Sequence, residues 1–224
     1  MNVDELVTRF PRLYHMAYDG SWPSIRRLGL LSTAALVERF GIDGEDRVRL
    51  CDRRRPASVE IHNPVYGKAI VRDQKPLNEA VLARVLEDGL TPIDWYRTLN
   101  AHVFFWPTEK RLLTLLQARA YRDDPQTILT VDTERLVGLH QAEIRLCPIN
   151  SGNTLFDARP RGLSTFSTIE AYPYGDWQRR RGPSAAIAEV AVLGGVPDIE
   201  AVVVAVARRL GGQLLEQLDP RPTR

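Results

Sequence analysis

The chain has 224 residues and a formal net charge of +2; 44% of its residues are hydrophobic and 26% are charged. These values are typical of a globular protein, and so small a net charge does not by itself indicate a protein that binds nucleic acid. The basic residues are clustered, however, at Arg53–Arg55 and Arg179–Arg181.

Two cysteines, Cys51 and Cys147, are too few for a disulfide framework, which favours a reducing, cytoplasmic setting. The N-terminus lacks the basic and apolar regions of a secretory signal. The most apolar stretch, residues 185–207, carries Glu189 and Pro197, so we expect no membrane span.

Short helices and strands follow one another through the first half of the chain. The clearest helix start is Thr91-Pro92-Ile93-Asp94, with a Thr cap, Pro in the first turn and Asp as reciprocal cap. Ser32 is expected to cap a helix in the same way. The elements predicted in chain order are a helix over 3–10, a strand over 13–17, helices over 21–29 and 34–40, a helical segment of uncertain end over 45–55, a strand over 59–61, an extended or loop segment over 66–77, and helices over 77–86 and 91–99.

The second half begins with compact apolar runs and then loses its periodicity. The elements predicted here are a strand over 103–106, an amphipathic helix capped by Thr108, a strand over 127–131, a helix over 133–139, strands over 143–146, 188–192 and 202–207, a helix over 210–218 and a flexible tail over 219–224. Residues 147–183 are irregular, and so long an irregular stretch inside a compact domain is usually functional. Short strands mixed with short helices predict a single α+β domain over residues 1–224.

One carboxylate stands in an otherwise apolar strand near the C-terminus. Glu189 lies within Ala188–Val192, and a buried ionised Glu must be paired, solvated in a cleft or used in chemistry. The segment before it, Tyr172–Gly182, is predicted to be a loop that mixes aromatic residues with three consecutive arginines. This combination suggests a site where an anionic substrate meets a carboxylate. The hydroxyl- and amide-rich segments 150–154 and 164–168 are candidates to line its pocket.

Three blocks of sequence carry a resemblance to a known fold. Leu13–Met16 followed by Ser24–Ser32 is a strand with a His and a helix that leads to a Gly-Leu turn. Val103–Trp106, the helix after it and Ile128–Val131 form a central strand-helix-strand unit, and the third block is the strand of Glu189 with its following turn. Together these blocks resemble the ADP-ribosyltransferase fold, most closely the DarT-type DNA ADP-ribosyltransferase toxins. The resemblance implies short twisted sheets flanked by helices around an NAD cleft.

The resemblance also implies roles for individual residues. Glu189 would be the catalytic carboxylate, and His15 would hydrogen-bond the ribose or nicotinamide side of NAD. The cofactor-binding residues it implies are Tyr14, His15, Ser32, Arg72 and Phe105, and the substrate-binding residues are Tyr174, Trp177, Arg179, Arg180 and Arg181. Arg72 is the first choice for the NAD pyrophosphate, with Arg53, Arg54 and Arg55 as alternatives. Residues 62–77 do not match the pattern expected of the toxins.

Each implied role has a chemical reason. Transfer from NAD passes through a positively charged ribose, which a carboxylate stabilises, and a guanidinium binds phosphate oxygens through two parallel hydrogen bonds. Tyr174 and Trp177 would stack on an unpaired base, an interaction worth about 1–3 kcal/mol per base, while Arg179–Arg181 would bind phosphates. We therefore expect an NAD-dependent mono-ADP-ribosyltransferase that modifies a nucleic-acid base, with single-stranded DNA as the first candidate.

Alternative interpretations stay open at the level of sequence. His15 can equally be a core histidine, Glu189 an exposed carboxylate on an edge strand, and Arg179–Arg181 part of a solvated loop. The alternative functions are an NAD glycohydrolase on the same fold and a non-enzymatic nucleic-acid- or protein-binding domain. The four histidines, His15, His62, His102 and His140, lack paired-ligand spacing, so we expect no metal. The chain has no Gly-x-Gly-x-x-Gly fingerprint, so an NAD site would not be of the Rossmann type.

Overall fold

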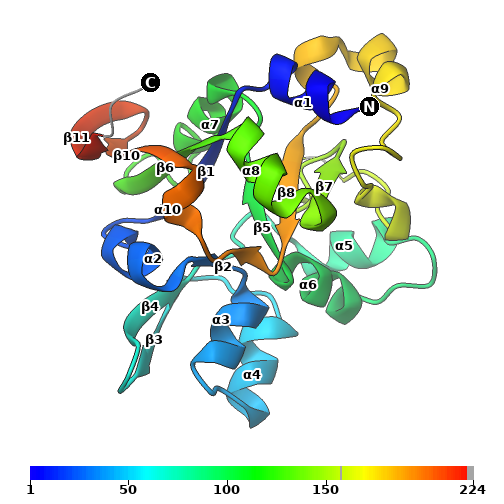
Figure 1. The fold of residues 1–224 in the computed structure, drawn as a ribbon. Helices are drawn as coiled ribbons and strands as arrows, with labels where there is room; N and C mark the ends of the chain where they lie inside the picture. The colour runs from blue at the N-terminus through cyan, green and yellow to red at the C-terminus, as the bar shows by residue number, and fades with distance from the viewer. Residues whose placement is uncertain (157, 221–224) are drawn as a thin grey trace.

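The computed structural model describes residues 1–156 and 158–220 and has the predicted α+β class (Figure 1). The helices are α1 (Val3–Arg9), α2 (Trp22–Leu28), α3 (Thr33–Arg39), α4 (Gly44–Cys51), α5 (Glu79–Val85), α6 (Pro92–Asn100), α7 (Glu109–Leu116), α8 (Thr133–His140), α9 (Tyr174–Arg181) and α10 (Ile199–Val202). The strands are β1 (Arg12–Tyr18), β2 (Leu30–Leu31), β3 (Val59–Asn63), β4 (Gly67–Val71), β5 (His102–Phe105), β6 (Gln126–Asp132), β7 (Ile144–Cys147), β8 (Glu189–Leu193), β9 (Gly195–Val196), β10 (Val203–Leu210) and β11 (Gln213–Pro220).

Two antiparallel sheets form the centre of the molecule. The first has the strand order β1-β6-β10-β11 and the second the order β5-β8-β7. Two backbone hydrogen bonds between Tyr14 and Trp106, of 3.0 and 2.7 Å, join β1 to the chain at the end of β5. The short pairs β2–β9 and β3–β4 lie beside this junction. The edge of the first sheet therefore meets the edge of the second.

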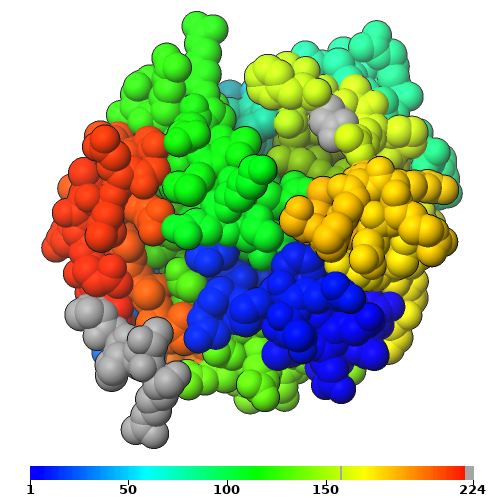
Figure 2. Space-filling view, turned by 90° about the horizontal axis from the view of Figure 1, so that it is seen from above, coloured from blue at the N-terminus to red at the C-terminus, as the bar shows by residue number. Residues whose placement is uncertain are grey.

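The main core lies between these sheets and the helices that cover them. It takes in buried side chains of β1, β5, β6, β8 and β10 together with those of α1, α8 and α10. A separate apolar cluster joins α3 and α4 to the β3–β4 hairpin, and a third lies between α5 and α6. On the face seen in Figure 2, α1 lies next to α9. There the N-terminal amine donates to the Tyr172 carbonyl (3.0 Å), and the Arg9 guanidinium lies 5.1 Å from the Tyr174 ring centre.

The helix starts that sequence predicted most clearly are confirmed. Thr91 and Asp94 form a complete capping box at the start of α6. The Ser32 hydroxyl accepts a hydrogen bond from the Ala35 amide (3.2 Å) and so caps α3. Ser21 stands at the predicted start of α2, yet its hydroxyl makes no cap bond. Satisfying the first amides of a helix needs only local side chains, which is why these starts can be predicted from sequence.

The structure corrects two predicted elements. Tyr172–Gly182 is not a loop, because its residues 174–181 form α9, which begins after Pro173 and ends at Gly182 with φ = +80°. Residues 210–218 do not form a helix, because Gly211-Gly212 turns the chain into β11, which pairs antiparallel with β10. Two glycines with positive φ favour a tight hairpin turn. The predicted tail begins within β11, which contains Asp219 and ends at Pro220, and residues 221–224 lie outside the described residues.

Gly195 has a backbone conformation and a close approach that other residues tolerate poorly. Its φ is +110°, and a Cβ atom there would lie 2.3 Å from the Leu30 carbonyl oxygen. Because both strain and overlap would result, we expect Gly195→Ala to lower the free energy of unfolding by about 2–5 kcal/mol. Chemical denaturation measures this change. Gly138→Ala, in α8 with nothing within 4 Å, is the matched control and should stabilise by about 0.4–1 kcal/mol.

Candidate functional site

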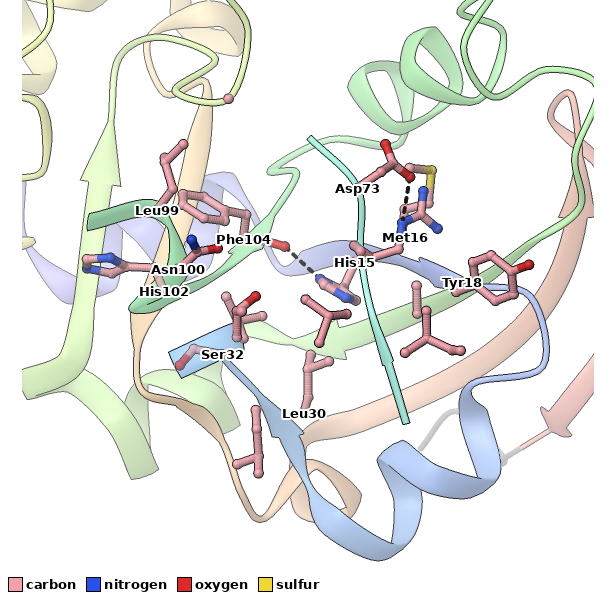
Figure 3. A pocket seen from close by; sticks show the side chains of 18 of the residues that line it. His15, Met16, Tyr18, Leu30, Ser32, Asp73, Leu99, Asn100, His102 and Phe104 are labelled. Carbon is pink, nitrogen blue, oxygen red and sulfur yellow. Dashed lines mark hydrogen bonds and ion pairs between the residues drawn. The ribbon is translucent and has the colours of Figure 1, made fainter. Parts of the chain in front are cut away.

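A pocket of about 290 Å³ lies at the junction of the two sheets (Figure 3). It is lined by residues of β1, α2, β4, β5 and β8 and by the segments that follow β4 and β7. In Figure 3, His15 stands between Asn100, His102 and Phe104 on one side and Asp73 and Tyr18 on the other. Four of the residues implied by the sequence line this one pocket: His15, Ser32, Arg72 and Glu189.

Glu189 is the first residue of β8 and is buried, with 3% of its surface exposed. Its Oε2 atom accepts hydrogen bonds from the Ser151 amide (3.0 Å) and the Ser151 hydroxyl (2.6 Å). Burial raises the pKa of Glu189 from 4.5 to about 7, although the bonds from Ser151 and the charges of Arg111 and Arg161 oppose this increase. The exposed edge-strand interpretation of Glu189 is therefore wrong. A carboxyl with a pKa near 7 is suited to accept or donate a proton at neutral pH.

His15, in the middle of β1, is held by the neighbouring sheet. Its Nδ1 atom lies 2.8 Å from the Phe104 carbonyl oxygen, and its ring centre lies 5.7 Å from that of Phe105. Burial lowers the pKa of His15 to about 4 despite that hydrogen bond. The ring is thus neutral at pH 7, and since a carbonyl only accepts, Nδ1 carries the proton. Nε2 is then an acceptor, suited to a hydroxyl or amide donor of a ligand.

The arginines considered for the NAD pyrophosphate differ in their burial and in their hydrogen-bond partners. Arg55 is buried, and its guanidinium donates to Asn100 Oδ1 (2.9 Å) and to the Arg72 carbonyl (2.8 Å). Burial lowers the pKa of Arg55 to about 10, so it stays charged at pH 7. Arg54 donates to the Lys75 carbonyl, and Arg53 does not line the pocket. Arg55 therefore supports the pocket wall, and Arg72 remains the first choice.

Arg72 follows β4 and has a 22% exposed side chain. Its Nη1 atom donates to Gln126 Oε1 (2.6 Å), and its guanidinium lies 5.4 Å from the ring centre of Tyr121. The Tyr121 hydroxyl donates to Asp73 Oδ1 (2.9 Å), and the Lys75 ammonium lies 5.3 Å from the same ring. Arg72 also pairs with Asp73, whose Oδ2 lies 3.8 Å from Arg72 Nε. One end of the pocket is therefore lined by this ion pair and by the Tyr121 ring, while Lys75 does not line the pocket.

The remaining residues implied for cofactor binding, Ser32, Tyr14 and Phe105, have structural contacts of their own. The Ser32 hydroxyl is used as the α3 cap, and its amide donates to the Gly194 carbonyl (3.1 Å). Tyr14 does not line the pocket but packs against the cluster of Leu112, Leu116 and Ile128, because neighbours of His15 on a strand point to the opposite face. Phe105 is fully buried in the main core and contacts His15 from there. Neither Tyr14 nor Phe105 lies at the pocket surface.

The implied substrate residues on α9 are not brought to the pocket. Tyr174 is buried and donates to the Pro183 carbonyl (3.2 Å), so its ring is not available to stack on a base. Trp177 is half-buried, and the guanidinium groups of Arg180 and Arg181 lie 5.5 and 4.3 Å from its ring centre. Arg179 pairs with Asp176. The predicted stacking platform is therefore wrong for Tyr174, and the arginines of α9 lie on a different surface.

Several pocket residues were not assigned a role from sequence. Ser151, Asn100, Tyr121 and Asp73 bond to the named site residues or to each other. The hydroxyl- and amide-rich segment 150–154 was the one signal that could have found Ser151, and its residues 150–152 do line the pocket. Residues 164–168 do not. Asn100 and Tyr121 gave no signal because isolated polar residues near helix ends are common.

The part of the chain that the structure describes offers neither a metal-binding cluster nor a membrane-spanning helix. In residues 1–156 and 158–220, no three His, Cys, Asp or Glu side chains lie close enough together to hold a metal ion. Over the same ranges, no helix has both the length and the apolar character that crossing a membrane requires.

Residues 11–203 match the model of a family described as a family of unknown function, DUF7002. The chain belongs to this family. Comparison with curated proteins gives no match. The matched span contains His15, Arg72 and Glu189 and ends at the first residue of β10, so it includes the whole pocket and leaves out the β10–β11 turn.

The raised pKa of Glu189 predicts a pH-dependent effect on stability. The unfolded carboxyl ionises near pH 4.5 and the folded one near 7, so stability due to Glu189 is full below pH 4.5 and is lost as the pH rises through 7. The loss amounts to about 3 kcal/mol. Glu189→Gln removes this loss, because the amide does not ionise. The variant should therefore have a higher free energy of unfolding than the wild type at pH 8 and nearly the same free energy at pH 4.

Denaturant unfolding at several pH values measures this difference. Glu134→Gln, at an exposed site in the first turn of α8, is the control and should show no such pH dependence. An equal effect of Glu189→Gln at pH 4 and pH 8 would contradict the raised pKa.

Proposed function

We propose that this protein is an NAD-dependent mono-ADP-ribosyltransferase that modifies a nucleic-acid base, with single-stranded DNA as the first acceptor to test. The observation that carries the proposal is the pocket itself. His15, Arg72 and Glu189 are far apart in sequence but line one cavity, and each has a state suited to its implied role. The type of reaction, transfer of ADP-ribose from NAD, is implied by the resemblance to DarT-type toxins and not by the geometry of the pocket.

The pocket fits part of a dinucleotide. Its volume of about 290 Å³ lies at the lower end of the range for small-molecule sites, so NAD would extend beyond it along the pocket mouth. His15 Nε2 offers an acceptor for a ribose hydroxyl or an amide N–H. Arg72 offers a guanidinium beside Tyr121 for phosphate oxygens. An acceptor at His15 and a charged donor at Arg72 support the proposal of NAD as the ligand.

Glu189 would assist the cleavage of the bond between ribose and nicotinamide. In the reaction, the bond between ribose C1′ and the nicotinamide nitrogen breaks, and its electron pair leaves with nicotinamide. A lone pair of the acceptor forms the new bond to C1′, and the acceptor proton passes to the carboxylate or to water. The ionised carboxylate stabilises the positive charge that develops on the ribose. With a pKa of about 7, Glu189 is ionised in about half of the molecules at neutral pH.

The second candidate function is an NAD glycohydrolase, in which water replaces the acceptor. The position of α9 favours this alternative, because its aromatic and basic residues do not line the pocket. Arg179 and Arg180 are nevertheless exposed on α9, where a phosphate of a bound strand would compete with Asp176 for Arg179 and with the Trp177 ring for Arg180. A dependence of nicotinamide release on DNA separates the two candidates.

Nicotinamide release from NAD by the purified protein, with and without single-stranded DNA, tests the proposed function. We expect release that requires DNA, a matching mass gain on the oligonucleotide, and a loss of at least about a hundredfold in Glu189→Gln, because the variant cannot supply a negative charge. Glu134→Gln should retain full activity.

Release without DNA and without a mass gain would favour the glycohydrolase. DNA binding without any release, in wild type and variant alike, would favour the non-enzymatic binding domain.

Arg72 has its own test in NAD binding. Replacement of the guanidinium by Ala removes a charged donor for phosphate, so we expect the Kd for NAD to rise about ten- to a hundredfold in calorimetry. Arg122→Ala is the matched control, since Arg122 is exposed and pairs with Asp123, and it should leave the Kd unchanged. Equal affinity of wild type and Arg72→Ala would remove Arg72 from the NAD site.

A further inference from the structure

Ser151 binds the Glu189 carboxylate with both of its donors. The amide (3.0 Å) and the hydroxyl (2.6 Å) donate to the same oxygen, Oε2. Ser151 is itself buried, and it lines the pocket beside Glu189. Two donors on one oxygen hold that oxygen in place better than one donor does, because each donor restrains it in a different direction.

Ser151 is in turn held in place by Arg161. The Ser151 carbonyl accepts hydrogen bonds from Arg161 Nη1 (2.8 Å) and from Trp95 Nε1 (3.3 Å). Arg161 is buried, and its other nitrogens donate to the carbonyls of Asn153 (3.1 Å) and Arg159 (3.0 Å). One guanidinium thus joins three carbonyls of the irregular segment that carries Ser151.

A second arginine fixes the start of the same segment. Arg181, at the end of α9, donates to the carbonyl of Pro148. The segment is therefore held by buried or half-buried guanidinium groups on both sides of Ser151. Backbone without regular secondary structure needs such partners, because its buried carbonyls have no ladder or helix bonds to make.

We propose that Ser151, anchored by Arg161, is the positioning residue that orients the Glu189 carboxylate in the pocket. This inference rests on the proposed function for its effect on turnover, but its structural part can be tested without activity. Three further groups face Glu189: the Cys147 thiol opposite it on β7, Arg111 on α7 and the Arg161 guanidinium. Burial keeps Cys147 a thiol, and the charges of Arg111 and Arg161 lower the pKa of Glu189. The bond from the Ser151 hydroxyl is a contact that Ser151→Ala removes, while the bond from the Ser151 amide remains.

The first measurement is the titration of Glu189 by carboxyl-carbon NMR, with Glu189→Gln to assign the signal. In Ser151→Ala we expect the midpoint to move upward by about one pH unit, because the lost hydroxyl stabilised the ionised form. Ser164→Ala is the matched control: Ser164 is exposed, lies in the same irregular segment and does not line the pocket, so it should leave the midpoint unchanged. An unchanged midpoint in folded Ser151→Ala overturns the proposal.

A wild-type measurement covers the case in which Ser151→Ala does not fold. The Ser151 amide proton should shift with pH at the same midpoint as the Glu189 carboxyl, since it donates to that carboxylate. The shift should be absent in Glu189→Gln. A Ser151 amide that does not follow the Glu189 titration overturns the proposal.

Turnover supplies a readout that a merely structural role would not move. In Ser151→Ala we expect kcat for nicotinamide release to fall about ten- to a hundredfold with the KM for NAD nearly unchanged, and the acidic limb of the pH profile to shift upward with the NMR midpoint. A rise in KM with unchanged kcat overturns the positioning role. If the NMR midpoint moves but no variant or wild type releases nicotinamide, the proposed function fails while the contact between Ser151 and Glu189 stands.

Discussion

The candidate site depends on the backbone pairing of Tyr14 with Trp106. These two hydrogen bonds hold the edge strand β1 of one sheet against β5 of the other. They place His15 within reach of the Phe104 carbonyl, and β5 in turn pairs with β8, which starts at Glu189. Because the bonds use backbone atoms, their strength depends on strand geometry and not on which side chains Tyr14 and Trp106 carry. The side chain of Tyr14 is left to pack on the far face.

The pocket is surrounded by polar groups that are unusually deeply buried. Glu189, Arg55, Asn100 and Arg161 are each almost inaccessible to solvent, yet each makes hydrogen bonds within the protein. Burying such groups without partners costs several kcal/mol, so their networks must be complete for the fold to be stable. Within this network the pKa of Glu189 is raised to about 7, because burial outweighs the bonds from Ser151 and the nearby arginine charges.

The segment Tyr172–Gly182 shows how residue types alone can favour a wrong structural prediction, here a substrate-binding loop. Tyr174, Trp177 and the three arginines after it are the residue types that bind single-stranded nucleic acid. In the structure they form α9, where Tyr174 packs into the core and two of the arginines stack on Trp177. The same cation and aromatic groups that would recognise a base and a phosphate satisfy one another instead. Pro173 and Gly182 are residue types that favour the start and the end of a helix. The aromatic and basic residues between them instead favoured the prediction of a binding loop.

Sequence alone determined the α+β class and most element positions, because caps, turns and strand alternation are local properties. It also showed a carboxylate, Glu189, within an apolar strand, but it left open whether that carboxylate was buried or exposed. Only the tertiary structure decided what surrounds that carboxylate: Ser151 lies 38 residues away in the chain and donates both its hydrogen bonds to it. Sequence likewise could not separate Arg72 from Arg55, since their difference is one of burial and partners. Contacts between distant segments depend on how the two sheets pack against each other, and no local sequence pattern predicts that packing.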